Sequence, residues 1–297
     1  MAGEEGLEPP NGGTKIRCLT TWLLPIIISI VPDVITDTLQ KSSIDSLDSE
    51  LLLAHVLKKD RAWLLAHSET PLSDSQKKEF DALIQRRINH EPVAYITGEK
   101  EFYGRSFTVN KHVLIPRPST EGLIDLALQY FQKPQEEMID VDSEIVVFSK
   151  VFKEESPQII VDIGTGSGCI AITLALELSE YSFIATDISE EALDVANKNA
   201  ARYNVADRIQ FLQRNLLDPL QNLDHPFLVI SNPPYIPNAD ILMQDVAQHE
   251  PKKALFAGPD GMDVLSTLFL QAQSHPYCVG CILESREEQA KKLIKQS

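Results

Sequence analysis

The stretch that decides the fold is Gln158-Ile159-Ile160-Val161-Asp162-Ile163-Gly164-Thr165-Gly166-Ser167-Gly168, at positions 158–168. Residues 159–163 form an apolar run with a single acid, which is typical of a strand that is buried on both faces of a sheet. The glycines that follow let the backbone turn sharply and approach a ligand closely. This combination predicts a buried parallel strand with a ligand-binding turn at its carboxyl end.

The alternation of strand and helix patterns continues after this stretch. Helical spacing of apolar residues predicts one helix at 170–178 and another that begins after Ser189. Further strands are predicted at 183–186, 209–212, 227–231 and 279–283. Apolar strands separated by helices indicate an α/β fold, with a doubly wound, Rossmann-like sheet covered by helices on both faces.

The earlier part of the chain has a different character. Short helical patterns predict a small bundle over residues 32–90, in which the helices stabilise one another because none is long enough alone. Residues 91–118 are rich in β-forming residues and are expected to be an extended linker with a β-hairpin. The sheet domain then spans 119–297, and its acidic stretch at 132–157 is expected to be a solvated insertion.

Residues 1–31 do not have the pattern of a domain, because prolines and glycines interrupt them and no period is sustained. We expect a disordered or spurious extension from a mis-assigned start. The apolar segment 19–31 contains Pro25 and is shorter than the ~20 residues that a bilayer requires. A signal peptide is the alternative, but Glu4 and Glu5 stand where basic residues would be expected.

The composition restricts the class of function. Lys and Arg total 27 against 43 Asp and Glu, which gives a net charge of −16 over 297 residues. Such a surface repels phosphate backbones, so stable nucleic-acid binding is disfavoured. Four cysteines do not make a disulfide scaffold in a chain of this length and favour a reducing compartment. We expect a cytoplasmic monomer without a membrane partner.

Two strand ends carry polar residues that indicate a cofactor. Asp187 follows the second strand, 23 residues after Gly164, where a carboxylate accepts hydrogen bonds from ribose hydroxyls. Cys169 stands where the dinucleotide fingerprint requires glycine, which weakens an NAD interpretation. The turn and Asp187 together favour an adenosyl ligand.

The sequence Ser231-Asn232-Pro233-Pro234-Tyr235 ends the fourth strand. The two prolines fix an extended turn without N–H donors, which leaves the Pro233 carbonyl and the Asn232 side-chain oxygen as acceptors. A planar –NH2 group has two donors that such a pair can hold, and Tyr235 adds a flat face and a hydroxyl. The pattern therefore indicates chemistry on a planar nitrogen.

The glycine turn, Asp187 and the Asn-Pro-Pro-Tyr sequence together resemble class I methyltransferases that use S-adenosylmethionine. The stretches 48–57, 91–121 and 250–262 are similar to the HemK/PrmC family, the peptide chain release factor N5-glutamine methyltransferases. The resemblance covers about residues 32–284. It implies methyl transfer from S-adenosylmethionine to the side-chain nitrogen of the glutamine in the Gly-Gly-Gln motif of class I release factors, which supports translation termination and leaves S-adenosylhomocysteine.

The resemblance also implies roles for individual residues. The cofactor would be contacted by Gly164, Thr165, Gly166, Ser167, Gly168, Asp187, Leu216 and Asn232. The substrate glutamine would be held, and the reaction catalysed, by Asn232, Pro233, Pro234 and Tyr235. The helical bundle would help to dock the release factor, and no metal ion is implied.

Three features depart from the family. Ser119 replaces a usual Asp, and Asn215 stands where an acid is common. Only residues 285–297 follow the last strand, enough for a helix at 287–295, so the C-terminal strand pair is expected to be missing. The strand at 279–283 would then be an exposed edge.

Several alternatives stay open. A DNA or RNA amino-methyltransferase shares the Asn-Pro-Pro-Tyr loop but predicts a basic surface, and an inactive truncated fragment would bind cofactor without turnover. Cys278 and Cys281 form a C-x-x-C, but they would point to opposite faces of a strand, so structural thiols are favoured over zinc ligands. His249 is interpreted as a loop residue, and Arg117 as either structural or substrate-binding.

Overall fold

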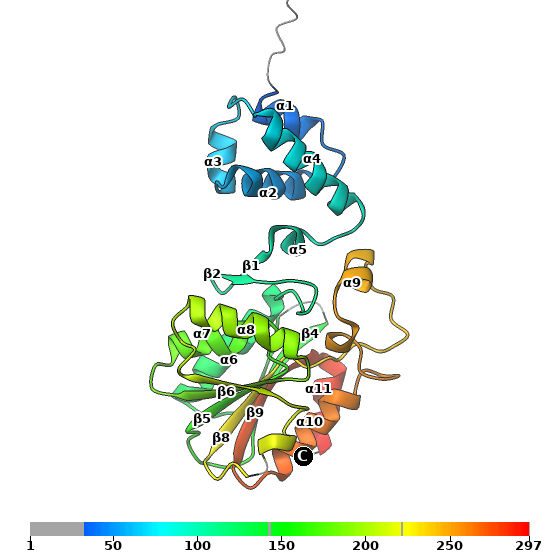
Figure 1. Cartoon of the computed structure of the whole chain (residues 1–297). Coiled ribbons are helices and arrows are strands. Elements are labelled where there is room, and N and C mark those ends of the chain that lie inside the picture. Colours follow the sequence, from blue (N-terminus) through cyan, green and yellow to red (C-terminus); the bar gives the residue numbers. More distant parts are fainter. Residues whose placement is uncertain (1–32, 142–143, 221, 297) are drawn as a thin grey trace, which may run out of the picture.

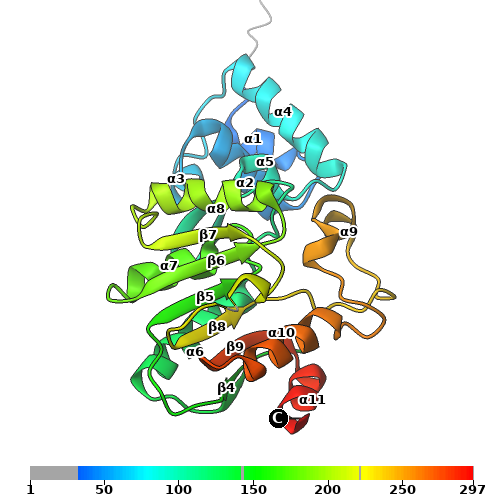
Figure 2. The same cartoon turned by 60° about the horizontal axis from the view of Figure 1, so that its bottom comes forward.

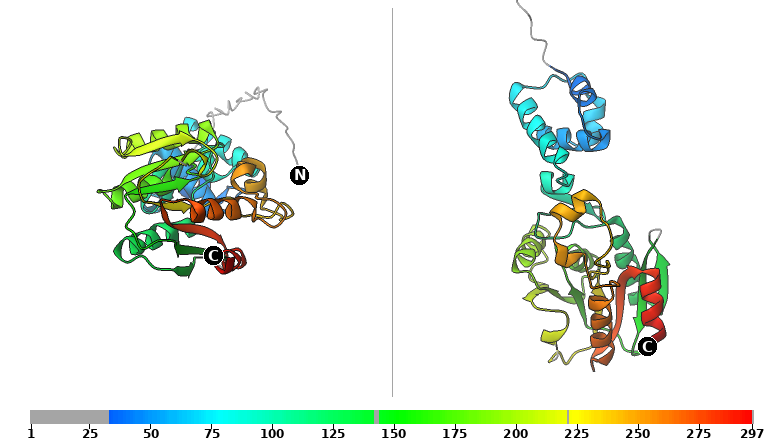
Figure 3. Two further views of the ribbon diagram at one scale, coloured as in Figure 1. Left: turned by 90° about the horizontal axis from the view of Figure 1, so that it is seen from below. Right: turned by 90° about the vertical axis from the view of Figure 1, so that its right-hand side faces the viewer.

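The computed structural model describes residues 33–141, 144–220 and 222–296, so the predicted extension at 1–31 lies outside the described residues. A helical bundle, a short linker and a helix-covered sheet follow one another along the chain (Figure 1). The bundle stands apart from the sheet, and the helix at residues 287–296 belongs to the domain that contains the sheet (Figure 3).

In residues 33–90, which the structure describes, the bundle contains four helices, namely α1 (Ile35–Gln40), α2 (Ser46–Leu57), α3 (Arg61–Ala66) and α4 (Asp74–Ile88). Side chains cap three of the amino termini, because Asp45, Asp60 and Ser73 each accept a backbone N–H from the first turn. The apolar faces meet in one core that includes Leu53 and Phe80. Burial of these faces stabilises helices that are individually too short to persist.

The linker begins with a helix where extended chain was expected. Residues Val93–Thr97 form α5, which follows Pro92 and ends at Gly98 with φ +77°. The side chain of Ile96 is buried in the bundle core, and α5 contacts α2 and α4. The prediction of extended chain is wrong here because burial overrides the β preference of the segment. The predicted hairpin follows, with β1 (Glu99–Phe102) antiparallel to β2 (Arg105–Thr108).

A single sheet contains the remaining strands of the described residues, in the order β3-β4-β9-β8-β5-β6-β7 (Figure 2). The strands are β3 (Glu137–Asp140), β4 (Ile145–Val151), β5 (Ile159–Ile163), β6 (Ser182–Asp187), β7 (Ile209–Gln213), β8 (Phe227–Ser231) and β9 (Cys278–Arg286). Strands β7, β6, β5, β8 and β9 are parallel, which confirms the predicted α/β sheet.

Helices cover both faces of this sheet. One face packs against α6 (Glu121–Gln132), α7 (Cys169–Glu177) and α8 (Glu190–Arg202), and the other against α10 (Asp263–Ser274) and α11 (Glu287–Gln296). The short helix α9 (Gln244–His249) lies away from the sheet, near the end of α4 (Figure 1). Its His249 ring nitrogen Nε2 is 3.3 Å from the carbonyl oxygen of Asn89. The doubly wound arrangement is therefore present. In addition, α9 contacts the end of the bundle.

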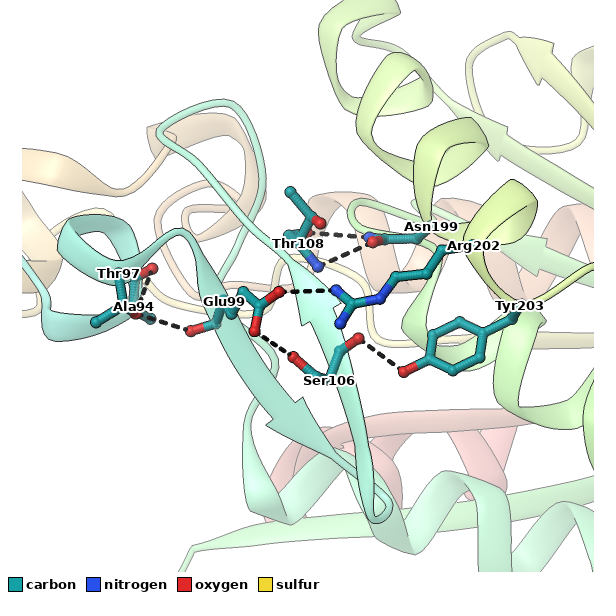
Figure 4. A network of polar contacts seen from close by, with 8 residues as sticks. All are labelled: Ala94, Thr97, Glu99, Ser106, Thr108, Asn199, Arg202 and Tyr203. Carbon is teal, nitrogen blue, oxygen red and sulfur yellow. Dashed lines mark hydrogen bonds and ion pairs between the residues drawn. The ribbon is translucent and has the colours of Figure 1, made fainter. Parts of the chain in front are cut away.

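The hairpin is fastened to α8 by a polar network (Figure 4). Asn199 on α8 pairs with both backbone groups of Thr108, because its Oδ1 accepts the N–H at 2.8 Å and its Nδ2 donates to the carbonyl at 3.0 Å. Arg202 donates to Glu99 at 2.8 Å, and the Tyr203 hydroxyl donates to the carbonyl of Ser106 at 2.7 Å. These contacts fix the linker on the sheet domain.

The acidic stretch at 132–157 is not a solvated insertion. It forms β3 and β4, and β4 pairs antiparallel with β9, with Val147 opposite Glu284. Val147 and Phe148 are fully buried, so acidic residues flank a short apolar run that belongs to the core. The expected exposed edge at 279–283 is also wrong, because β4 covers it. The outermost strand is now β3, whose shortness and terminal acids oppose edge-to-edge pairing.

We expect Phe148→Ala to lower the free energy of unfolding by about 3–5 kcal/mol, since it removes a fully buried aromatic ring. Urea unfolding followed by circular dichroism measures this change. The control is Met138→Ala on β3, where the side chain is exposed, and its effect should stay within about 0.5 kcal/mol. Equal stability of the two variants would contradict a core role for β4.

Candidate functional site

A cavity of about 680 Å³ lies along the carboxyl edge of the parallel strands. Parallel strands end at the same edge of a sheet, so segments that are far apart in the sequence meet there. Several predicted site residues line this cavity, namely Gly164, Gly166, Asp187, Leu216, Asn232, Pro233 and Pro234. The structure therefore brings together residues that end or follow β5, β6, β7 and β8.

The glycines of the turn after β5 have two different uses. Gly164 and Gly166 have φ of +71° and +55°, and a Cβ built on Gly164 would meet nothing within 4 Å. The backbone there is open to the cavity, as a closely approaching ligand requires. Gly168 has φ +81°, and a Cβ on it would lie 2.8 Å from Ile172 Cδ1 and 3.1 Å from Ala196 Cβ. Its role is the close packing of α7 on α8.

Thr165 and Ser167 point into the protein, since both are buried and neither is among the residues that line the cavity. The Thr165 hydroxyl donates to Asp162 Oδ2 at 2.6 Å. The carbonyl of Ser167 accepts Nδ2 of Asn199 at 2.8 Å. Because Asn199 also holds Thr108, one buried amide joins the hairpin to the glycine turn. These residues shape the turn from behind.

Asp187 is held by the backbone around it. Its Oδ2 accepts the N–H of Gly166 at 2.9 Å, and its Oδ1 accepts the N–H of Ser189 at 2.9 Å. Burial raises the pKa of Asp187, whereas these backbone hydrogen bonds lower it in part. The next residue, Ile188, lines the cavity and is 53% exposed. A carboxylate beside an exposed apolar side chain and an open glycine turn suits a ligand that carries both a ribose and a flat base.

The Asn-Pro-Pro-Tyr sequence is anchored at both ends. Asn232 Nδ2 donates to Thr120 Oγ1 at 2.9 Å, so its Oδ1 is left to face a ligand. The Tyr235 hydroxyl donates to Glu284 Oε1 at 2.9 Å, within the protein and away from the cavity lining. Tyr235 was expected to offer this hydroxyl to a substrate, but in this structure Glu284 engages it. A Cβ at Gly261 would collide with the Tyr235 carbonyl oxygen, so the backbone is also enclosed.

Arg117, whose role the sequence left open, has a structural partner. It forms an ion pair with Glu250 at 2.5 Å, and the side chain of Glu250 is 1% exposed. The second oxygen of Glu250 accepts the N–H of Ile115 at 3.1 Å. The pair therefore binds the linker to the segment that follows the Asn-Pro-Pro-Tyr sequence.

Sequence reasoning missed the functions of Thr120, Asn199, Glu250 and Glu284. All four are buried polar residues. The available signal was a polar residue in an apolar context, as in Leu283-Glu284 at the end of a strand. Such a signal identifies a buried group but not its partner.

The C-x-x-C cysteines differ from their expected placement. A register shift between β8 and β9 lies beside Cys278, and both Cys278 and Cys281 are buried in the same core cluster. The prediction of opposite faces is wrong because this bulge changes the alternation of the strand. Both thiols are free.

The described residues contain neither a metal-binding cluster nor a membrane-spanning helix. No group of three or more His, Cys, Asp or Glu in that part of the chain is placed to hold a metal ion. Within the same residues, no helix is both long and apolar enough to cross a bilayer.

Comparisons with known proteins decide the family. Residues 34–98 match the PrmC N-terminal domain, and residues 135–254 match the methyltransferase small domain. A release factor glutamine methyltransferase of Coxiella burnetii is 36% identical over 249 residues, which cover 84% of this chain and 81% of that protein. The chain belongs to the release factor glutamine methyltransferase family.

Other proteins that match this chain differ from it in length or share less of its sequence. A bifunctional methyltransferase of Rickettsia prowazekii is 40% identical over 264 residues, which cover 87% of this chain and 50% of that protein. The chain thus spans about half the length of that relative. Among solved structures, the catalytic domain of human Mettl16 in complex with the MAT2A 3′UTR hairpin 1 matches with a TM-score of 0.42 and 15% identity, over 74% of this chain and 72% of that one.

Asp162, which precedes the glycine turn, makes the stability of the folded protein depend on pH. Burial raises the pKa of Asp162 from 3.8 to about 7. Between these values the unfolded chain has lost the proton that the folded chain keeps, so stability falls as pH rises. Asp162→Asn does not titrate there. We expect the unfolding free energy of the variant, relative to the wild type, to increase by about 3 kcal/mol from pH 5 to pH 8.

Urea unfolding of the cofactor-free protein at several pH values measures this difference. Asp194→Asn, on the exposed face of α8, is the control and should follow the wild-type pH profile. Parallel profiles for Asp162→Asn and the wild type would show that Asp162 is ionised in the folded protein.

Proposed function

We propose that this protein transfers a methyl group from S-adenosylmethionine to the side-chain amide nitrogen of the glutamine in the Gly-Gly-Gln motif of class I peptide chain release factors. Family membership supports this reaction, since the Coxiella burnetii relative is named a release factor glutamine methyltransferase. The observation that carries the proposal is the position of Asn232 on the cavity, with its Nδ2 engaged by Thr120 and its Oδ1 left as an acceptor.

The cavity residues fit the adenosyl group of the cofactor. Asp187 would accept hydrogen bonds from the ribose, Gly164 and Gly166 would allow close approach of the methionine part, and Leu216 and Ile188 would contact the base. When bound, S-adenosylmethionine supplies an electrophilic methyl group, and S-adenosylhomocysteine is the product. We propose that no metal ion takes part.

The chain's own residues would orient the reacting nitrogen. An amide nitrogen is a poor nucleophile because its lone pair is delocalised. Asn232 Oδ1 and the Pro233 carbonyl would accept the two N–H groups of the substrate and hold the nitrogen in place. Proximity and alignment then lower the barrier, and the same acceptors interact more strongly as positive charge develops on nitrogen. The N-protonated amide that methyl transfer forms is a strong acid and loses its extra proton to water, so no strong general base is required in this mechanism.

We propose that the helical bundle docks the release factor beside this loop. The support is the contact between the bundle and α9, which lies in the segment after the Asn-Pro-Pro-Tyr sequence. Arg87 on α4 lies 4.0 Å from Asp245 on α9, and Asn89 contacts His249. A protein held by the bundle would therefore lie near the catalytic loop.

We propose that the protein acts as a cytoplasmic monomer without stable nucleic-acid binding. The net charge of −16 supports the lack of affinity for phosphate backbones. The free, buried cysteines support a reducing compartment.

Mass spectrometry of the release factor tests the proposed function. The protein is incubated with S-adenosylmethionine and a full-length class I release factor, and the Gly-Gly-Gln peptide is examined for one added methyl group. A release factor with Gly-Gly-Glu is the control. Methylation of DNA or RNA instead would favour the nucleic-acid alternative, and cofactor binding without any turnover would indicate an inactive fragment.

We expect Asn232→Ala to lower kcat by at least ~100-fold, because it removes an acceptor that orients the nitrogen and stabilises developing charge. The Kd for the cofactor should change by less than about threefold, which calorimetry measures. Asn238→Ala, an exposed asparagine in the same loop, is the matched control and should retain wild-type turnover. An unchanged kcat in Asn232→Ala would contradict the mechanism.

We expect Asp187→Ala to weaken cofactor binding by about 10- to 100-fold, because it removes charge-assisted hydrogen bonds to the ribose and frees the turn at Gly166. Titration calorimetry with S-adenosylhomocysteine measures the Kd. Asp194→Ala on the exposed face of α8 serves as the control. Equal affinity in both variants would exclude Asp187 from the cofactor site.

A further inference from the structure

A buried carboxylate lies behind the substrate loop and has no part in the mechanism above. Glu284, near the carboxyl end of β9, is 0% exposed. Its Oε1 accepts the Tyr235 hydroxyl at 2.9 Å. Its Oε2 is buried and has no hydrogen-bond partner among the described residues. A buried acceptor without a partner is costly, so its retention needs a physical reason.

The Thr120 side chain interacts with both this carboxylate and Asn232. This side chain is buried, and its Oγ1 accepts Asn232 Nδ2 at 2.9 Å. Burial raises the pKa of Glu284, and the hydroxyls of Thr120 and Tyr235, the charge of Arg117 and the Asn232 side chain lower it in part. Asn232 and Tyr235, the two ends of the Asn-Pro-Pro-Tyr sequence, therefore both interact with Glu284.

The chemistry of these groups sets a direction for the hydrogen bonds. An ionised carboxylate can only accept, a hydroxyl donates one hydrogen, and a side-chain amide has one accepting and one donating end. If Thr120 donates its hydrogen toward Glu284, its lone pair accepts Asn232 Nδ2, and Oδ1 of Asn232 faces the cavity. If Thr120 instead donated to Asn232, the amide would turn and present Nδ2 to the N–H groups of the substrate.

We propose that Glu284, acting through the Thr120 hydroxyl, is a positioning residue that fixes which end of the Asn232 amide faces the substrate. In this proposal the Thr120 hydroxyl turns its hydrogen toward Oε2, the Glu284 oxygen that Tyr235 does not engage. This inference rests on the proposed function, since only a substrate with N–H donors makes the amide orientation important. It assigns a role to Thr120 and Glu284 that depends on the direction of their hydrogen bonds.

The test compares three variants in the release factor methylation assay. Thr120→Val keeps the shape but removes the hydroxyl, and its kcat should fall about 10- to 100-fold with little change in the Kd for S-adenosylhomocysteine. Thr120→Ser keeps the hydroxyl and should stay within about threefold of the wild type. Glu284→Gln keeps the shape but introduces a donor, which can reverse the direction of the bonds, so its kcat should fall as in Thr120→Val.

The double variant Thr120→Val with Glu284→Gln gives a readout that a merely structural role would not produce. If Thr120 and Glu284 act through the same hydrogen bonds, either substitution alone already removes their joint effect. The kcat of the double variant should then be no lower than that of the slower single variant. Thermal unfolding and cofactor binding identify a variant that does not fold. If Thr120→Val does not fold, the kcat of Glu284→Gln is compared with that of Thr120→Ser, and a lower kcat in Glu284→Gln supports the positioning role.

The outcomes separate the two proposals. Wild-type methylation with equal kcat in Thr120→Val and Thr120→Ser, or with losses that multiply in the double variant, would overturn the positioning role alone. A wild-type protein that does not methylate the release factor would overturn the proposed function, and this inference with it.

Discussion

Parallel strands in one sheet must end at a common edge, and every residue of the candidate site depends on this constraint. Gly164, Asp187, Leu216 and Asn232 lie at or after the ends of four different strands and line the same cavity, while Glu284 near the end of β9 lies behind the loop that carries Asn232. None of these residues is positioned by its neighbours in sequence alone. The strand pairing sets their spacing, and the buried polar contacts beneath the edge set their orientation.

The linker connects the helical bundle to the residues around the cavity. Asn199 joins the hairpin to the glycine turn, and the Arg117–Glu250 ion pair joins the linker to the segment after the Asn-Pro-Pro-Tyr sequence. Because Glu250 is buried, salt screens this ion pair less than it would screen an exposed pair. The helical bundle is therefore attached to the cavity by specific contacts, which suits a domain that would present a protein loop to a fixed catalytic group.

The parallel strands, the bundle and several of the residues that line the cavity could be predicted from sequence, because apolar periodicity and glycine spacing are local signals. The helix α5 could not, since Ile96 is helical only because the bundle buries it. The strand β4 was hidden by the acids around its apolar run, and its partner β9 lies more than a hundred residues away. Asn199 and Glu284 were missed for a related reason, because a buried polar group has meaning only with its partner.

The position of β9 between β8 and β4 has a consequence for how the protein is made. A ribosome releases β4 and β8 well before β9, so the growing chain holds two unpaired strand edges with a gap between them. The sheet can close only when residues 278–286 arrive, and the contacts that they complete are long-range ones that form slowly. During synthesis the two open edges are targets for chaperones and for aggregation until β9 pairs between them.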